Sequence, residues 1–301
     1  MEQIGFIGLG RMGRPMAANL VKRGFTLTVR DIDSRPVAYL VERGAHEAAD
    51  LHKLAQTSDI VVTMLPNSQI VKDTLLGPDG VIAHARPGTM LLEMSTIDPT
   101  VTDQIAKVAG AKGIGLVDAP VGRLASHADR GECLFMVGAD PESLARVKPL
   151  LDAMGTTVLH CGPVGSGMRM KLVNNFLAVA SCQLNAEALA LSQALGLDLN
   201  RTMEVLNGTS AYNGQLQLNW KHKSLTGDIT PGFTIDLAHK DLSLILEAAN
   251  ALRLPMPMGA AAREMFSAAR AGKYASADFS AMGDALCDLA GLEKPRLRPA
   301  G

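Results

Sequence analysis

A glycine-rich motif near the N-terminus places the strongest constraint on the fold. Residues 8–13 read Gly-Leu-Gly-Arg-Met-Gly, after an apolar run and before a segment with helical spacing. A G-x-G-x-x-G pattern between a strand and a helix is typical of a dinucleotide-binding unit. Gly8 permits the tight turn, Gly10 lets a pyrophosphate approach the backbone, and Gly13 allows the helix to pack closely on the strand. The free N–H groups of the helix N-terminus favour phosphates.

A carboxylate at the end of the second expected strand indicates which dinucleotide binds. Asp31 lies 18 residues after Gly13. Such a carboxylate accepts hydrogen bonds from the ribose hydroxyls and repels the 2′-phosphate of NADP, so we expect NAD. Arg30 precedes it, and a guanidinium there could bind that phosphate. NADP therefore stays open as the alternative.

The first half of the chain alternates short β-type runs with helical segments. Strands are expected at residues 3–7, 26–30, 60–65, 89–93, 114–118, 134–137 and 157–159. Helical spacing between them, as at 12–23 and 99–109, predicts βαβ units, a parallel sheet and a doubly wound fold. Ligands bind at the carboxyl ends of such strands, which draws attention to Leu65 and to the loop 95–99, where Ser95 or Thr96 could cap the next helix.

The pattern changes after residue 162. A long helical stretch over 166–195 contains no proline, and helical segments follow at 198–207, 236–252, 257–271 and 278–290 without a strand-like run. The turn-rich stretch 162–165 marks the boundary. We therefore predict an α/β fold class: a Rossmann doubly wound sheet over 1–162, a long interdomain helix within 163–195, and an all-α domain over 196–301.

Composition excludes several classes of protein. The formal charge of −1 provides no basic field for nucleic acid. No apolar stretch reaches the ~18 residues of a membrane span, and the N-terminus lacks the basic region of a signal peptide. The four cysteines are scattered, without the spacing of a disulfide framework or a metal site, and His239 and Asp241 lack a third ligand. We expect a cytoplasmic protein with no metal.

Several ordered blocks resemble the β-hydroxyacid dehydrogenases, which include 3-hydroxyisobutyrate dehydrogenase and tartronate semialdehyde reductase. The similar stretches are 5–20, 64–66, 93–96, 118–121, 167–175 and 240–242. The resemblance implies an NAD-dependent oxidoreductase with a Rossmann domain followed by a helical domain. It also implies a homo-oligomer, a dimer or tetramer, and the Ala-rich stretch 178–190 suggests a subunit interface.

The resemblance also implies roles for individual residues. It maps a catalytic lysine onto Lys171, an asparagine one helical turn later onto Asn175, and a lysine near the nicotinamide end of the cofactor onto Lys240. Further cofactor contacts of the family map onto Arg11, Met12, Asp31, Leu65 and Thr96.

One block departs from the family. Most members carry Ser-Gly-Gly after Asp-Ala-Pro-Val, whereas this chain carries Gly122-Arg123-Leu124. A guanidinium offers a fixed fork of donors that suits an oxyanion such as a sulfonate. Gly122-Arg123, together with Asn174-Asn175 and the block 235–242, resembles the 3-sulfolactaldehyde reductase branch of the family. That branch forms 2,3-dihydroxypropane-1-sulfonate with NADH during sulfoquinovose breakdown. Leu124, Ala125 and Ala178 depart from that branch, Ala178 standing where a serine is expected near the substrate.

The predicted reaction is reduction of a small acidic aldehyde to its alcohol. NADH supplies the hydride, and Lys171 as an ammonium can donate the proton and stabilise the developing charge. The substrate residues are then Gly122, Arg123, Asn174, Asn175 and Ala178. The alternatives are 3-hydroxyisobutyrate, 4-hydroxybutyrate (succinic semialdehyde) and tartronate semialdehyde as substrates. A non-catalytic NAD-binding regulator is a further alternative, against which Lys171, Asn175 and Lys240 together argue.

Overall fold

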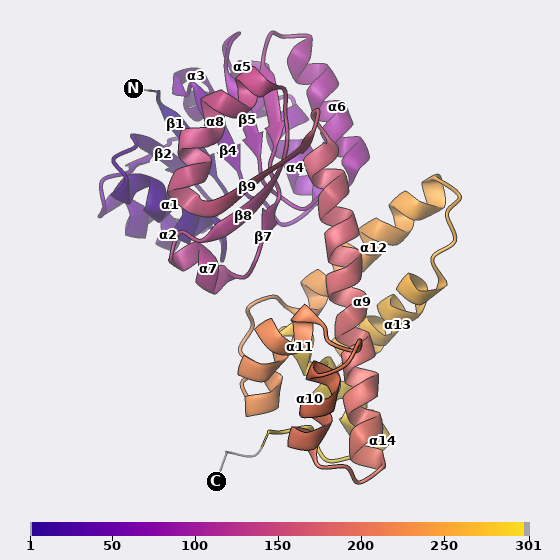
Figure 1. The fold of residues 1–301 in the computed structure, drawn as a ribbon. Helices are drawn as coiled ribbons and strands as arrows, with labels where there is room; N and C mark the ends of the chain where they lie inside the picture. The colour runs from indigo at the N-terminus through magenta and orange to yellow at the C-terminus, as the bar shows by residue number, and fades with distance from the viewer. Residues whose placement is uncertain (1, 298–301) are drawn as a thin grey trace. The chain divides into compact units, whose positions relative to one another are not determined.

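The computed structural model describes residues 2–297, and the chain divides into two compact units after Lys171 (Figure 1). We call the part up to Lys171 unit 1 and the part from Leu172 onward unit 2. Unit 1 contains a nine-stranded sheet. Its strands are β1 (Ile4–Ile7), β2 (Leu27–Arg30), β3 (His46–Glu47), β4 (Ile60–Thr63), β5 (Met90–Glu93), β6 (Gly115–Asp118), β7 (Val121–Gly122), β8 (Cys133–Gly138) and β9 (Gly155–Gly162).

The order of the strands is that of a doubly wound sheet. It runs β3-β2-β1-β4-β5-β6-β8-β7, with β9 paired to β8. The strands β1 to β6 are parallel, as predicted, whereas β8 runs antiparallel to β6 and β7. The antiparallel pairing of β8 was not predicted, nor were β3 and β7, of two residues each.

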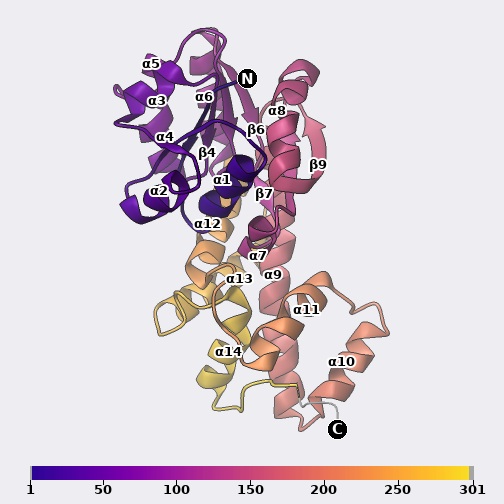
Figure 2. The ribbon, with the colours of Figure 1, turned by 90° about the vertical axis from the view of Figure 1, so that its left-hand side faces the viewer.

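Helices cover both faces of this sheet. The helices of unit 1 are α1 (Gly13–Lys22), α2 (Ser34–Val41), α3 (Leu51–Thr57), α4 (Ser68–Leu76), α5 (Val81–His84), α6 (Pro99–Gly110), α7 (Ala125–Asp129) and α8 (Pro141–Met154). Alternate strand residues pack against α1, α2, α7 and α8 on one face and against α3 to α6 on the other, and Figure 2 shows α3 to α6 and α8 on opposite sides of the sheet. Two buried cores result, because the side chains of a strand point alternately to the two faces.

The helix α9 (Ser166–Ala194) begins in unit 1 and continues through unit 2. The other helices of unit 2 are α10 (Leu199–Asn207), α11 (Gly214–Leu218), η1 (Trp220–His222), η2 (Ser224–Thr226), α12 (Ile235–Ala251), α13 (Pro257–Arg270), η3 (Phe279–Ala281) and α14 (Met282–Ala290). They enclose a core around the fully buried Trp220. The predicted helical second half is confirmed, with one isolated bridge, Thr234 to Asp278, as its strand-like pairing among the described residues.

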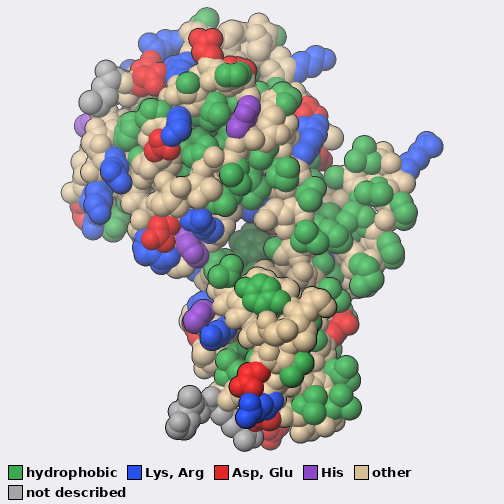
Figure 3. Space-filling model, viewed as in Figure 1, with side chains coloured by type: hydrophobic (Ala, Val, Ile, Leu, Met, Phe, Trp, Pro, Cys, Tyr) green, Lys and Arg blue, Asp and Glu red, His purple; other side chains and the backbone are tan. Residues whose placement is uncertain are grey.

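Acidic and basic side chains are interspersed on the face in Figure 3, without a large region of one sign. Within residues 2–297, no helix is both long and apolar enough to cross a membrane. The same residues contain no cluster of three potential metal ligands, and the four cysteines are free thiols.

Candidate active site

The glycine-rich loop lies where the strand order of the sheet reverses, between β1 and β4. Gly8 has φ of 93°, which favours glycine, and a Cβ there would collide with the carbonyl of Met64. A Cβ on Gly13 would collide with the carbonyl of Gly8, whereas one on Gly10 would meet open space. The loop therefore combines close packing at its two ends with an accessible backbone at Gly10, which fits a pyrophosphate at a switch point.

The first turn of α1 follows this loop directly. The helix begins at Gly13 with Met12 as its N-cap residue, and no side chain caps the free N–H groups. Arg11 is exposed and Met12 is half-buried. These groups are able to hold the phosphates of a dinucleotide, because the N–H groups and positive dipole end of the helix favour an anion.

Asp31 lies beside the glycine loop. Its carboxylate accepts hydrogen bonds from the backbone N–H of Leu9 at 2.5 Å and of Asp33 at 2.8 Å. The guanidinium of Arg30 instead donates to the carbonyls of Ala48 at 3.3 Å and Ala49 at 3.0 Å. The acidic group is thus held at the loop by backbone atoms, while the neighbouring cation is engaged by carbonyls after β3.

The loops after β4 and β5 are joined to each other. The backbone N–H of Leu65 donates to the hydroxyl of Ser95 at 2.8 Å, and Thr96 next to it is half-buried. Asp98 caps α6, accepting from the N–H of Thr100. The suggestion that Ser95 or Thr96 caps that helix was wrong, because the hydroxyl of Ser95 is used between the two loops.

A row of three buried polar side chains ends the strands β4, β5 and β6, and the sequence analysis missed it. Thr63, Glu93 and Asp118 are register neighbours, each at most 1% exposed. Glu93 accepts from the hydroxyl of Thr63 and the N–H of Ser95, both at 2.5 Å. Burial raises the pKa of Glu93 to about 7 and also raises that of Asp118. A polar residue at the end of each of three consecutive strands was the available signal.

Lys171 is buried beside strand β7. It is 8% exposed, and its Nζ donates to the carbonyl of Val121 at 2.7 Å. The start of its helix is held by Asp118, whose carboxylate accepts from the N–H of Gly165 at 2.5 Å and of Met168 at 2.7 Å. A buried ammonium is a suitable proton donor when a backbone carbonyl holds it in place. Here that carbonyl belongs to Val121, which directly precedes the predicted substrate residues Gly122 and Arg123.

Arg123 lies two residues after Val121, whose carbonyl binds Lys171, but the side chain of Arg123 contacts other residues. Its guanidinium donates to the carbonyl of Glu132 at 2.7 Å and to the hydroxyls of Thr156 at 2.9 Å and Thr157 at 3.2 Å. Its φ is 70°, in the left-handed region that non-glycine residues rarely adopt, while Gly122 before it is buried. Strain of this kind is concentrated at functional sites.

The remaining predicted residues lie in unit 2. Asn175 is buried and donates to Asp241 at 2.5 Å, and Asn174 donates to the Oδ1 of Asn175 at 3.0 Å. The ammonium of Lys240 lies 3.0 Å from the other carboxylate oxygen of Asp241, which is 2% exposed. Ala178, one turn beyond Asn174, is half-buried. Asp241 thus joins two predicted residues but was not itself predicted as a site residue.

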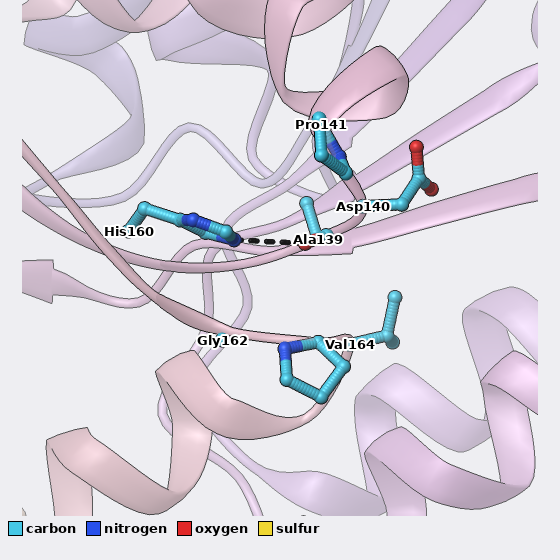
Figure 4. A pocket seen from close by; sticks show the side chains of 7 residues that line it. Ala139, Asp140, Pro141, His160, Gly162 and Val164 are labelled. Carbon is cyan, nitrogen blue, oxygen red and sulfur yellow. Dashed lines mark hydrogen bonds between the residues drawn. The ribbon is translucent and has the colours of Figure 1, made fainter.

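A separate pocket of about 560 Å³ in unit 1 contains none of the predicted residues (Figure 4). Its lining comprises Ala139, Asp140, Pro141, His160, Gly162, Pro163 and Val164. The ring of His160 bonds to the carbonyl of Ala139 at 2.9 Å, and Asp140 caps α8 through the N–H of Ser143. Both polar side chains serve the local structure.

Two family models match the chain. The NAD binding domain of 6-phosphogluconate dehydrogenase matches residues 3–162. The model described as NAD-binding of NADP-dependent 3-hydroxyisobutyrate dehydrogenase matches residues 165–286. These matches, which cover both units, agree with a site for a nicotinamide dinucleotide.

Similar proteins of known activity cover nearly the whole chain. The 3-sulfolactaldehyde reductase of Escherichia coli (strain K12) is 42% identical, over 94% of this chain and 95% of its own length. An NAD-dependent L-serine dehydrogenase of Pseudomonas aeruginosa is 40% identical, over 93% and 96%. The structure of Mycobacterium tuberculosis 3-hydroxyisobutyrate dehydrogenase with L-serine superposes with a TM-score of 0.86 at 31% identity, covering 95% of this chain and 99% of the other.

Proposed function

The chain belongs to the β-hydroxyacid dehydrogenase family, and from this premise we propose that it reduces 3-sulfolactaldehyde to 2,3-dihydroxypropane-1-sulfonate with NADH. As a member of this family, the protein is an NAD-dependent oxidoreductase that acts on CH–OH groups. The proposed substrate places the enzyme in the breakdown of sulfoquinovose. The single observation that supports a sulfonated substrate is the presence of Arg123 at a position where most of the family has a small residue.

Lys171 is the proposed general acid. When bound, NADH supplies the hydride that reaches the carbonyl carbon. The ammonium of Lys171 donates a proton to the carbonyl oxygen and stabilises the negative charge that develops there. The carbonyl of Val121 holds that ammonium at 2.7 Å and so limits the orientations it can take. Asn175, one turn later on α9, is proposed to contact the substrate, and Lys240 the nicotinamide end of the cofactor.

The backbone of Arg123 supports its proposed role in binding the sulfonate. A φ of 70° costs of order 1–3 kcal/mol for a non-glycine residue, and glycine would avoid that cost. The guanidinium is also bound by the carbonyl of Glu132 and the hydroxyls of Thr156 and Thr157 rather than by a carboxylate. These neutral oxygens compete weakly with an anion for a guanidinium, because a hydrogen bond between two charged groups is stronger than one to a neutral acceptor.

Arg123→Ala tests the substrate proposal. We expect KM for 3-sulfolactaldehyde to rise by about 10- to 100-fold, as expected for loss of about 1.5–3 kcal/mol of charged hydrogen bonding, with little change for a neutral aldehyde. Thr156→Val should lower that KM slightly, because it removes a competing acceptor. NADH oxidation is measured with sulfonated, carboxylated and neutral aldehydes side by side.

The matched control is Arg130→Ala, which removes an exposed guanidinium seven residues away that pairs with Glu132. An equal rise in KM for charged and neutral aldehydes with Arg123→Ala would contradict the proposal. Preference for succinic semialdehyde or tartronate semialdehyde over the sulfonate, or NAD-dependent oxidation of 3-hydroxyisobutyrate, would instead support one of the alternative activities.

The preference for NAD over NADP is proposed from Asp31. Its carboxylate is fixed by the N–H of Leu9 beside the glycine loop, where it would repel a 2′-phosphate. Arg30, the residue that could bind that phosphate, is engaged by the carbonyls of Ala48 and Ala49. NADPH should therefore bind more weakly than NADH.

We further propose that the protein is a homo-oligomer in the cytoplasm, a dimer or tetramer. On α9, the exposed residues Leu177, Leu184 and Leu191 recur every seven residues, each more than half exposed. Apolar residues at this period match the seam of a coiled coil, so the same stripe of a second copy is the expected partner. Within the Ala-rich stretch 178–190, Ala180, Ala186 and Ala190 are buried in unit 2, so the exposed Leu184 of that stretch is proposed to make the contact. Light scattering on the protein would reveal a monomer if the proposal is wrong.

A further inference from the structure

The buried row at the carboxyl ends of β4, β5 and β6 includes a carboxylate outside the chemistry described above. Glu93 is fully buried and carries hydrogen bonds from one side chain and one backbone group. The hydroxyl of Ser95 also bonds to it and strengthens its ionised form. A buried carboxyl group is costly, so its retention inside unit 1 calls for a role.

These hydrogen bonds continue from Glu93 to a predicted cofactor loop. The hydroxyl of Ser95 accepts from the N–H of Leu65 at 2.8 Å, so Ser95 joins the loop after β5 to the loop after β4. The backbone N–H of Ser95 donates to Oε1 of Glu93 at 2.5 Å. One carboxylate therefore binds the residue that joins the loops after β4 and β5.

We propose that Glu93 is a positioning residue for the cofactor: in its ionised form it holds the loops of Leu65 and Ser95 in the conformation that binds NADH, and protonation loosens them. The proposal rests on the cofactor site described above and does not depend on which aldehyde is reduced. Glu93 acts through Ser95 and is not itself a catalytic residue.

The chemistry of the hydrogen bonds gives the reason. An ionised carboxylate only accepts, which suits the donors Thr63 and Ser95. Once protonated, one of its oxygens becomes a donor and competes for the hydroxyl of Ser95. That hydroxyl then becomes a poorer acceptor for the N–H of Leu65, and the joint between the loops weakens. NADH affinity should therefore fall as the pH drops.

The groups facing Glu93 place this change near neutral pH. Burial is the largest influence and raises its pKa to about 7, while the hydrogen bonds from Ser95 and Thr63 lower it. Asp118, the register neighbour on β6, is a like charge and raises it further. The carboxylate should be ionised above about pH 7 and protonated below it.

The test is the dissociation constant of NADH measured by fluorescence titration between about pH 5.5 and 8.5, on the full chain without aldehyde. For the wild type we expect Kd to rise about tenfold from pH 8 to pH 6, with a midpoint near 7, as for loss of one charge-assisted hydrogen bond. Glu93→Gln should bind NADH with a Kd that does not depend on pH and lies at the wild type's low-pH value. Glu142→Gln, an exposed change on α8, should keep the wild-type profile.

Thr63→Val separates positioning from a merely structural role. It removes one donor to the carboxylate, so the pKa of Glu93 should rise and the midpoint should move to higher pH. A wild-type Kd that is constant over this range, or a midpoint that persists in Glu93→Gln, would overturn the proposal, as would an unmoved midpoint in Thr63→Val. Failure of the wild type to bind NADH even at pH 8 would instead refute the cofactor site itself.

Discussion

The two units hold their predicted site residues in different ways. In unit 1 the charged groups are anchored mainly by the backbone: Lys171 by the carbonyl of Val121, Asp31 by the N–H of Leu9, and Asp118 by N–H groups at the start of α9. In unit 2 they are anchored by one another, since Asp241 contacts both the amide of Asn175 and the ammonium of Lys240. Secondary structure determines the first arrangement, and a network of side chains the second.

This difference has an energetic consequence. A group held by the backbone can be removed without changing where its neighbours lie. In a side-chain network, the loss of one member leaves the others without a partner, so that effects of substitutions are not additive. Outside the hydrogen bonds that join Glu93 to Thr63 and Ser95, unit 1 should therefore respond to substitution residue by residue, and the network around Asp241 in unit 2 as a group.

The largest effect is expected for Lys171→Ala. Turnover should fall by about 10²- to 10⁴-fold, the usual contribution of a positioned acid, while Kd for NADH stays within about twofold. Stopped-flow or steady-state NADH oxidation measures the turnover, and fluorescence titration measures the Kd for NADH. Combined with Asp31→Asn, which acts on cofactor binding, the effects on kcat/KM should add.

The control for this prediction is Lys148→Ala, which removes an exposed lysine paired with Asp152 on α8. Near-normal turnover of Lys171→Ala would remove the proposed acid. A large loss of NADH affinity in that variant would show that unit 1 does not respond residue by residue.

An intermediate effect is expected for Asp241→Asn. Because both Asn175 and Lys240 lose their common charged partner, kcat/KM should fall by about 10- to 100-fold, as expected for loss of about 1.5–3 kcal/mol of hydrogen bonding to a charged group. In a double-mutant cycle with Asn175→Ala, the combined loss should be clearly smaller than the sum of the two. The cycle is measured from kcat/KM values for a fixed aldehyde.

Asp236→Asn is the matched control on α12, since its exposed carboxylate pairs with Arg270. It should change kcat/KM by less than about twofold, as surface ion pairs contribute little. Full additivity of Asp241→Asn and Asn175→Ala would remove the distinction between the two units.

The smallest effect concerns the pH dependence of stability. Because the folded-state pKa of Glu93 is raised from 4.5 to about 7, the folded state binds a proton more tightly than the unfolded state. The stabilisation is present below about pH 4.5 and is lost as the pH rises through about 7. Glu93→Gln lacks this contribution, so the wild type minus variant difference in Tm should fall by a few degrees between pH 5 and 8, at about 2–4 °C for each kcal/mol. Differential scanning fluorimetry without cofactor measures it, and a difference independent of pH would contradict the raised pKa.

Much of the fold was predictable because it follows from local patterns. The glycine motif, the alternation of strands and helices, and the change to helices after residue 162 are properties of short stretches. The short strands β3 and β7 and the antiparallel β8 were not predictable in this way, because pairing partners determine them and two-residue strands carry no pattern. The extended C-terminal stretch also has a tertiary partner: Arg296 forms an ion pair with Asp284 at 2.7 Å.

The site divides along the same line. Residue types and spacing indicated the glycine loop and Asp31, because a local motif relates them, whereas the family resemblance implied Lys171 with Asn175 one helical turn later. Only the tertiary structure showed that Glu93 lies between Thr63 and Asp118, that Asp241 joins Asn175 to Lys240, and that the guanidinium of Arg123 rests on Thr156 and Thr157. Apart from the adjacent residues Lys240 and Asp241, the groups in contact are 25 to 66 residues apart in the chain, and no local preference encodes a contact that strand register and helix packing create.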